Sequence, residues 1–207
     1  MKKIIACTLL IAFLFTMTGC SGQQASEDGT DSSEYIYFGA TAALSGDNAL
    51  IGQYMTEAGA LFEENINEAG GVLGRPVKII YEDEGASDQG SINAAKKLIS
   101  RGDITAIVGS FVSSSNNIAI IPTIESAQTP LFAGGSSANI KYEESDYTYM
   151  CRLSDDLTGS TMATAAVDVL GMSKIAIIHG SDSFGAGLRD QVTQALKEQY
   201  DIEPVLD

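Results

Sequence analysis

The sequence predicts an α/β fold built around a parallel sheet, and three observations lead to this fold class. Short apolar runs typical of strands alternate with segments in which apolar residues recur every three or four positions. The run Ile104–Val108 is continuously apolar, as expected of a strand buried on both faces of a parallel sheet. The length of 207 residues suits one ordinary domain or part of a larger, two-lobed protein.

A first series of elements is predicted between residues 35 and 133. Strands are expected over residues 35–44, 77–81, 104–108 and 131–133, and helices over residues 55–69, 91–100 and 114–126. In the first helix we expect an inward-facing apolar stripe at helical spacing, made of Met55, Ala58, Leu61, Phe62, Ile66 and Ala69. In the second helix, Ile92, Ala95, Leu98 and Ile99 should face inward, and Ser87 or Asp88 can cap its start. Because strands and helices alternate, the strands should lie parallel to one another.

A second series follows a polar connector, residues 139–146. Residues 149–152 should be extended, residues 158–170 and 188–199 helical, residues 174–179 a buried strand, and residues 203–206 the start of another strand. Two strands and two helices would leave sheet edges and an apolar face uncovered. We therefore expect the chain to be a truncated form of a longer protein.

The N-terminus predicts export. Two lysines precede an apolar run, residues 4–15, which is too short for a permanent membrane span. Such a pattern predicts a secretory leader over residues 1–19. Its end, Met17-Thr18-Gly19-Cys20, is similar to the lipobox of bacterial lipoproteins, with Met17 where leucine is usual. This similarity implies that Cys20 is lipidated and anchors the protein to the extracytoplasmic face of the cell membrane. The alternative is a plain signal peptide whose cleavage site contains a cysteine.

Composition narrows the possible partners and cofactors. Residues 20–34 hold almost no apolar side chains and predict a disordered tether. A formal charge of −15 makes nucleic acid an unfavourable partner. Outside the leader and Cys20, the body has a single cysteine, Cys151, which we expect to be a buried structural thiol. No second cysteine or histidine lies at a metal-ligand spacing from it, so neither a metal site nor a cofactor is predicted.

Several segments, in their order along the chain, resemble one family. They are NINEAGGVLGRPVKIIYEDEGASD, AAKKLI, ITAIVGSFVSSSN, TPLFAGGSSANI and IAIIHGSDSFGAGL. Together they resemble the branched-chain-amino-acid type of extracytoplasmic solute-binding protein, which serves ABC transporters and has the type 1 periplasmic-binding fold. The resemblance implies two doubly wound lobes joined by a hinge that the chain crosses three times. Residues 35–150 would be lobe one, and residues 151–207 the first hinge crossing with part of lobe two.

Three loops follow predicted strands and are candidates for a ligand site: residues 44–47, 109–115 and 134–137. Ligands of parallel sheets bind beyond the carboxyl ends of the strands. Hydroxyl and free backbone N–H groups at the start of a helix form an uncharged receptor for a carboxylate. From the residues alone, Ser113, Ser114 and Ser115 could equally be helix caps and turn residues.

The resemblance implies roles for particular residues in these loops. Ser113 would hold the α-carboxylate of the ligand, and Gly135 and Ser137 would bind its ammonium and carboxylate groups. The remaining predicted site residues are neighbours in these loops or parts of the pocket wall: Phe111, Val112, Ser114, Ser136, Phe184 and Ile51. No catalytic residue is predicted.

The sequence therefore predicts a lipid-anchored binding protein that captures an amino acid or an amide-like small solute for an ABC permease. One alternative is a ligand-binding sensor or receptor domain of the same fold. A Rossmann-like enzyme is less favoured, because no complete dinucleotide fingerprint is present and His179 is the single histidine.

Overall fold

The structure is a computed structural model that describes residues 35–140 and 144–205. The predicted leader, Cys20 and the tether lie outside the described residues.

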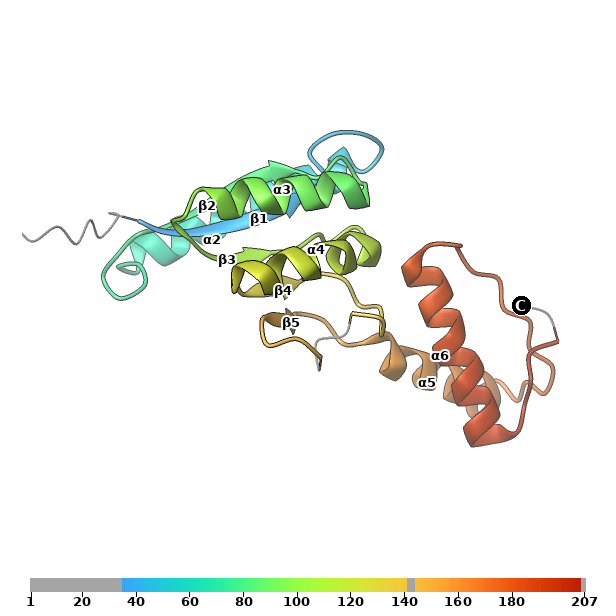
Figure 1. Cartoon of the computed structure of the whole chain (residues 1–207). Coiled ribbons are helices and arrows are strands. Elements are labelled where there is room, and N and C mark those ends of the chain that lie inside the picture. The colour runs from blue at the N-terminus through green and yellow to red at the C-terminus, as the bar shows by residue number, and fades with distance from the viewer. Residues whose placement is uncertain (1–34, 141–143, 206–207) are drawn as a thin grey trace, which may run out of the picture. The chain divides into compact units, whose positions relative to one another are not determined.

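A five-stranded parallel sheet forms the centre of the first part of the chain (Figure 1). Its strands are β1 (Ile36–Ala42), β2 (Val77–Asp83), β3 (Ile104–Val108), β4 (Leu131–Ala133) and β5 (Thr148–Met150). They lie side by side in the order β2-β1-β3-β4-β5, and every neighbouring pair is parallel. The predicted α/β fold with a parallel sheet is therefore confirmed.

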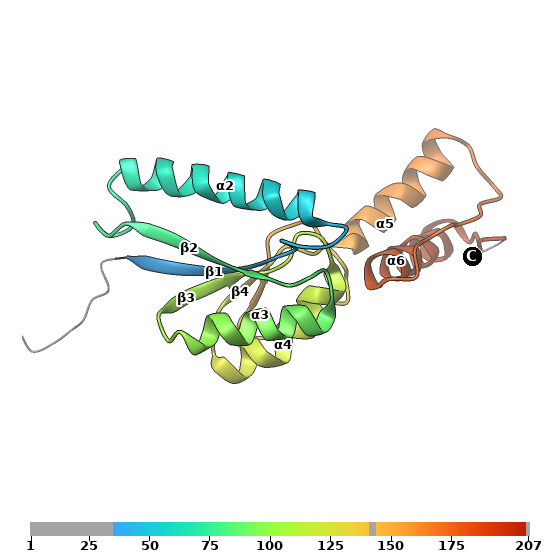
Figure 2. The ribbon, with the colours of Figure 1, turned by 90° about the horizontal axis from the view of Figure 1, so that it is seen from above.

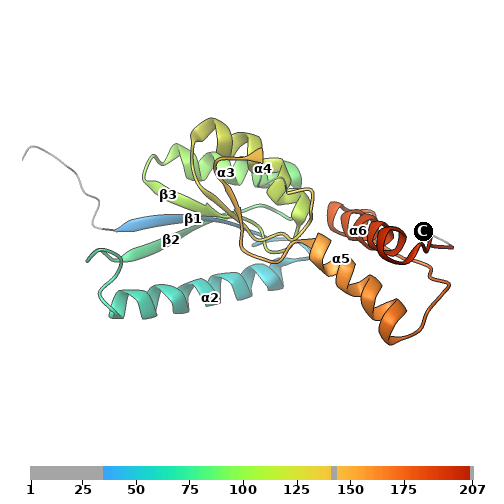
Figure 3. The ribbon, with the colours of Figure 1, turned by 90° about the horizontal axis from the view of Figure 1, so that it is seen from below.

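Helices cover both faces of this sheet. Helix α2 (Ala49–Glu68) lies on one face, and α3 (Asp88–Ser100) and α4 (Ser114–Ala127) lie on the other, as Figures 2 and 3 show from opposite sides. The chain thus winds in both directions from β1, which confirms the doubly wound arrangement. Helix α3 begins where the sequence places a cap, because Ser87 Oγ accepts a hydrogen bond from Gly90 N at 3.1 Å.

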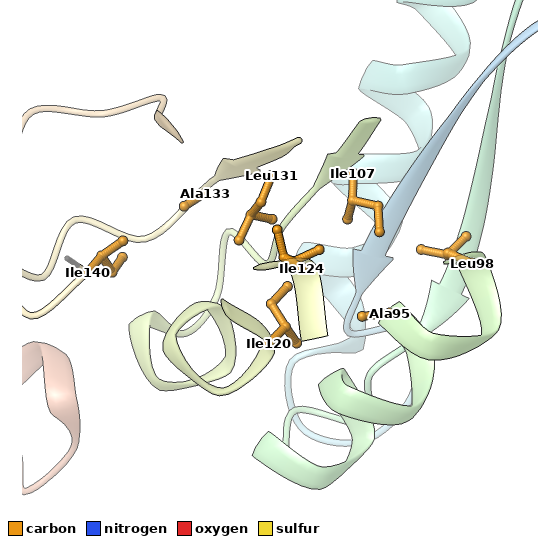
Figure 4. Close-up of a cluster of buried hydrophobic side chains, with 8 residues drawn as sticks. All are labelled: Ala95, Leu98, Ile107, Ile120, Ile124, Leu131, Ala133 and Ile140. Atoms are coloured by element: carbon orange, nitrogen blue, oxygen red, sulfur yellow. The ribbon is translucent and has the colours of Figure 1, made fainter. Parts of the chain in front are cut away.

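The core lies between the sheet and helices α3 and α4. Figure 4 shows its eight buried residues, Ala95, Leu98, Ile107, Ile120, Ile124, Leu131, Ala133 and Ile140. As predicted, Ala95 and Leu98 of α3 face inward, and Ile107 of β3 is fully buried. Burial of β3 on both faces holds only at its centre, because Thr105 is exposed.

Helix α2 approaches its neighbours most closely at two glycines, and of the predicted apolar stripe only Met55 and Ile66 are half-buried. A Cβ atom at Gly52 would lie 2.0 Å from Ala43 O, and one at Gly59 would lie 1.7 Å from the Tyr81 hydroxyl. Of the predicted stripe, Leu61 and Phe62 are 59% and 49% exposed. The prediction of this stripe was therefore partly wrong. Close approach of the backbone at the two glycines sets which face of the helix meets the sheet.

Residues 151–205 form a second cluster. It contains α5 (Asp155–Thr164), which continues as one π-helical segment (Ala165–Val169), and α6 (Ser183–Tyr200). Helices α5 and α6 pack against each other around Ala163, Val192, Ala195 and Leu196.

One predicted strand in this part of the chain is wrong, and a second is only partly covered by the described residues. Residues 174–179 form no strand, and Ile178 is 96% exposed, whereas Ile175 and Ile177 pack on the α5/α6 cluster. Of the strand expected over residues 203–206, residues 203–205 form no strand, and residue 206 lies outside the described residues. Val205 N donates one backbone hydrogen bond to Ile175 O at 2.8 Å. The physical reason is that a strand needs a continuous ladder of backbone partners, and within residues 174–179 only Ala176 takes part in a β-bridge.

The expected burial of Cys151 was also wrong, because this residue is exposed directly after β5. Within residues 35–140 and 144–205, no helix is long and apolar enough to span a bilayer.

Candidate functional site

A cavity of about 300 Å³ opens where the loops after the strands meet the start of helix α4. Seven of the nine predicted ligand-binding residues lie on its wall: Phe111, Val112, Ser113, Ser114, Gly135, Ser136 and Phe184. Five further residues that were not predicted to bind ligand complete the wall: Asn48, Ala86, Ser115, Arg152 and Asp182. The structure therefore brings most of the predicted site together in one place.

The N-terminus of α4 forms one side of this cavity. Ser113 is its N-cap, and Ser113 Oγ accepts a hydrogen bond from Asn116 N at 3.2 Å. A hydroxyl group has one donor and two acceptor positions, so this oxygen can cap the helix and still donate its proton to a ligand. The two interpretations of Ser113, helix cap and ligand donor, are thus compatible with one geometry. The first N–H groups of a helix and its dipole favour an anion at this point.

The loop after β4 forms the adjoining wall and is held close to α4. Ser137 N donates to Ser114 Oγ at 3.3 Å, and Asp155 N donates to Ser136 O at 2.8 Å. A Cβ atom at Gly135 would lie 2.9 Å from Ser114 Oγ. A side chain at this position would therefore push the loop away from the helix start, which explains the glycine.

Arg152 brings a positive charge to the cavity wall. It stands two residues after β5, and its Nη1 lies 3.5 Å from Gly134 O. Among the described residues it has no ion pair within 4 Å. Its guanidinium is therefore available to a ligand anion.

The carboxylate of Asp155 interacts with the charge of this guanidinium, and that of Asp182 lies on the same cavity wall. Burial raises the pKa of Asp155, while a hydrogen bond from Ser136 and the charge of Arg152 act in the opposite direction. Asp155 is 2% exposed and its Oδ2 has no hydrogen-bond partner within the described part of the chain. Asp182 lies on the cavity wall and caps α6, with Asp182 Oδ1 accepting from Gly185 N at 2.7 Å.

Phe111 and Phe184 give the cavity an apolar surface. They come from the loop after β3 and from the first turn of α6, and they are 42% and 44% exposed. Because these side chains are this exposed, they can bury more apolar area when a solute binds.

Two predicted residues do not lie on the cavity wall. Ser137 is fully buried, and its Oγ donates to Ser183 O at 3.3 Å and accepts from Asn139 N at 3.2 Å. Ile51 lies in the first turn of α2 and is 43% exposed. In this arrangement Ser137 holds the loop in place, and its predicted contact with a ligand remains a prediction, as does that of Ile51.

Sequence reasoning overlooked Arg152 and Asp182. The loops predicted to bind the ligand follow strands β1, β3 and β4, and the last two of these loops carry no cation. The available signal for Arg152 was its position just beyond a strand of the same parallel sheet, where ligand-binding side chains gather. Within the described ranges, no group of three or more histidine, cysteine or acidic residues could hold a metal ion.

Comparison with known proteins identifies the family. The profile of the family described as "Periplasmic binding protein" matches residues 35–205. An amino acid binding protein of Pseudomonas aeruginosa is 29% identical over 173 residues, which are 83% of this chain and 46% of that protein.

Solved structures show the same fold. The branched-chain amino acid transporter substrate-binding protein LivJ of Streptococcus pneumoniae, in complex with isoleucine, is 20% identical with a TM-score of 0.72, covering 84% of this chain and 49% of that one. A solute-binding protein of an ABC transporter from Rhodopseudomonas palustris, in complex with 3,4-dihydroxybenzoic acid, is 19% identical with a TM-score of 0.69, covering 84% of this chain and 46% of that one.

The chain spans about half the length of the relatives that it matches. Those relatives are named as binding proteins and not as enzymes. The resemblance to the branched-chain-amino-acid type of solute-binding protein is confirmed, and the chain belongs to the periplasmic binding protein family.

Proposed function

We propose that the chain is part of a lipid-anchored extracytoplasmic protein that captures an amino acid or a similar small carboxylate and delivers it to an ABC permease. The observation that carries this proposal is the meeting of the α4 N-terminus with Arg152 at one cavity. Relatives named for amino acids, and solved neighbours with isoleucine or an aromatic acid, support the same class of solute.

A carboxylate fits this cavity for electrostatic reasons. The start of α4 offers backbone N–H groups and the hydroxyls of Ser113 and Ser115, and Arg152 offers a planar fork of N–H donors. Asp182 places a negative charge on the same wall, although part of its hydrogen-bonding capacity is used by Gly185 N. Opposite charges on one wall suit a zwitterion better than a neutral solute.

Capture would proceed by closure. The wall is made by loops of the sheet, by Arg152, and by Asp182 and Phe184 at the start of α6. A solute that contacts both groups of residues favours the arrangement in which they are closest, because a ligand shifts an equilibrium by its differential affinity for the two states.

Calorimetry with a solute series tests the proposal. The series is L-leucine, L-isoleucine, 3,4-dihydroxybenzoate, 4-methylpentanoate, which is leucine without its ammonium, and 3-methylbutylamine, which is leucine without its carboxylate. We expect at least one carboxylate to bind and 3-methylbutylamine not to bind. Arg152→Gln should weaken the bound carboxylate by about tenfold or more, since a charge-assisted hydrogen bond is lost.

Ser113→Ala should weaken binding of the carboxylate. Ser100→Ala is its matched control and should leave binding unchanged, because Ser100 is an exposed serine at the C-terminal end of α3. Binding of 3-methylbutylamine as tight as that of leucine would contradict the proposed carboxylate receptor.

The lipid anchor is tested separately in a bacterial host. The wild-type protein should incorporate labelled palmitate and partition into detergent, and Cys20→Ser should abolish both. Cys7→Ser is the control, because Cys7 lies within the predicted leader. Palmitate incorporation that persists in Cys20→Ser would remove this part of the proposal.

A further inference from the structure

A buried glutamate lies behind the candidate site without touching the cavity. Glu84 directly follows β2 and is fully buried. Its Oε1 accepts a hydrogen bond from Ser110 Oγ, and its Oε2 lies 3.1 Å from Ser91 Oγ. No cation forms an ion pair with Glu84 within residues 35–140 and 144–205. A carboxylate without a counter-ion is stable in the interior only if hydrogen bonds satisfy it, so its serine partners are essential to it.

A buried asparagine connects the next two loops. Asn117 lies in α4 and is fully buried. Its Nδ2 donates to Ser110 O at 2.7 Å and to Ser113 O at 2.8 Å, while its Oδ1 accepts from Gly134 N at 3.2 Å. A Cβ atom at Gly109 would lie 2.2 Å from that Oδ1, so the loop after β3 closes tightly around the amide.

Ser110 joins these two residues into one network. Its hydroxyl donates to Glu84 and accepts from Val112 N at 3.2 Å, and its carbonyl accepts from Asn117. Glu84, Ser110 and Asn117 do not line the cavity, yet each bonds to a segment that does. The network therefore fixes the backbone that presents Val112, Ser113 and the residue after Gly134.

The turn after Glu84 gives this network a second effect at the cavity. Gly85 and Ala86 both have positive φ, 54° and 49°, and Ala86 lies on the cavity wall. A left-handed conformation is unfavourable for alanine and persists where the surroundings determine it. Anchoring of Glu84 on one side and capping of α3 by Ser87 on the other hold this turn in place.

We propose that Glu84 and Asn117 are positioning residues of the solute site, which set the geometry of the loops after β2, β3 and β4 without contacting the solute. This inference rests on the proposed function, since it concerns the same cavity. Binding sites depend on such supporting hydrogen bonds because small displacements of the donors reduce affinity steeply.

Isosteric and non-isosteric variants of Glu84 test the proposal in the intact protein. Glu84→Gln can accept from Ser110 Oγ and donate to Ser91 Oγ, whose proton then turns to Ser87 O, 3.1 Å away. We expect Glu84→Gln to bind the solute found by calorimetry within about threefold of wild type, and Glu84→Leu to lose about tenfold or more. Asn117→Asp keeps the acceptor for Gly134 N but loses both donated bonds, so it should lose affinity to a similar degree.

Glu82 provides the matched control. It lies on β2, two residues before Glu84, and its carboxylate pairs with Lys97 Nζ at 2.7 Å. Glu82→Leu should leave affinity within about threefold of wild type. All titrations are made well below the melting temperature of each variant, with circular dichroism confirming the fold.

Hydrogen exchange of the ligand-free protein gives a readout that does not depend on the solute. The amides of Val112 and Gly134 should be protected in wild type and Glu84→Gln. In Glu84→Leu the Val112 amide should lose its protection and exchange faster, and in Asn117→Leu the Gly134 amide should do so. Wild-type affinity and wild-type protection in both Glu84→Leu and Asn117→Leu would overturn the proposal. If wild type binds no solute of the series while exchange follows this pattern, the proposed solute class fails and the positioning role stands.

Discussion

Residues 35–150 and residues 151–205 respond differently to the same kind of sequence pattern. In the first region, which we call the sheet region, every predicted strand pairs with a parallel neighbour. In the second, the helical region, both predicted helices form, whereas residues 174–179 and 203–205 form no strand. A helix satisfies its backbone within itself, whereas a strand depends on a neighbour. In this chain, the sequence patterns of helices therefore predict helices in both regions, whereas those of strands predict strands only where a neighbouring strand is present.

Two isoleucines show the difference at the level of single side chains. Ile107 in β3 is fully buried between α3, α4 and the neighbouring strands, and Ile178 in the run 174–179 is 96% exposed. Both lie in short apolar stretches of the sequence, residues 106–108 and 175–178. Burial therefore follows the presence of packing partners more than the hydrophobicity of the run.

The largest expected effect is on the core of the sheet region. Ile124→Ala should lower the free energy of unfolding by about 3–4 kcal/mol, because the side chain is fully buried among residues of the sheet, α3 and α4. Leu196→Ala in the helical region should cost less, about 2 kcal/mol, because its cluster is one helix pair that can close around the lost volume. Urea denaturation followed by circular dichroism measures both. Equal costs would show that the two clusters are equally rigid.

A smaller effect is expected where α2 meets the sheet. Gly59→Ala should cost about 1–3 kcal/mol, since the new methyl group would overlap the Tyr81 hydroxyl. Gly180→Ala in the helical region is the matched control and should stay within about 0.5 kcal/mol, because its Cβ would meet nothing closer than 3.5 Å. Thermal unfolding of both variants checks this. A neutral Gly59→Ala would mean that α2 is free to move away from β2.

The contact between the two regions at Asp155 should depend on pH. Because burial raises its pKa above the ordinary 3.8, the folded protein binds this proton more tightly than the unfolded chain. The stability should therefore fall as the pH rises from about 3.8 through the folded pKa. Asp155→Asn should remove this dependence and gain up to about 1 kcal/mol at neutral pH, with no difference in acid. Denaturant titrations across the acid range measure it, and a variant less stable than wild type at neutral pH would contradict it.

The smallest effect is expected at Ile178. Ile178→Ser should change the free energy of unfolding by less than about 0.5 kcal/mol, because the side chain is almost fully exposed. A buried strand at residues 174–179, as the sequence predicts, would instead lose about 2–5 kcal/mol. Chemical denaturation separates the two outcomes, and a loss in the larger range would reinstate the strand.

The sequence predicted those parts of the fold that local patterns control. The inward face of α3 follows from apolar spacing, and its start at Ser87 follows from cap chemistry. The face of α2 was predicted only in part, because Gly52 and Gly59 allow the closest approach but have no side chain that a hydrophobic pattern can include. Local patterns therefore place helices along the chain better than they orient them.

In the candidate site, too, the sequence predicted the residues that local patterns mark and missed the others. The serines at the start of α4 were found from their position between a strand and a helix. Glu84 and Asn117 were missed because nothing local marks a polar residue that will be buried, and their partners are up to 26 residues away. Such residues are defined by contacts between loops, which only the folded chain reveals.

The three-residue strand β5 has one more consequence. Its register with β4 pairs Phe132 with Tyr149 and Ala133 with Met150, and Cys151 N continues the ladder to Ala133 O at 3.1 Å. Arg152 is the next residue, so the register between β4 and β5 fixes the position of its charge along the strand direction. One residue inserted or deleted just before it would shift that charge by about 3.3 Å and turn it to the opposite face. An insertion or deletion at this point would therefore change where the positive charge of Arg152 stands relative to the cavity.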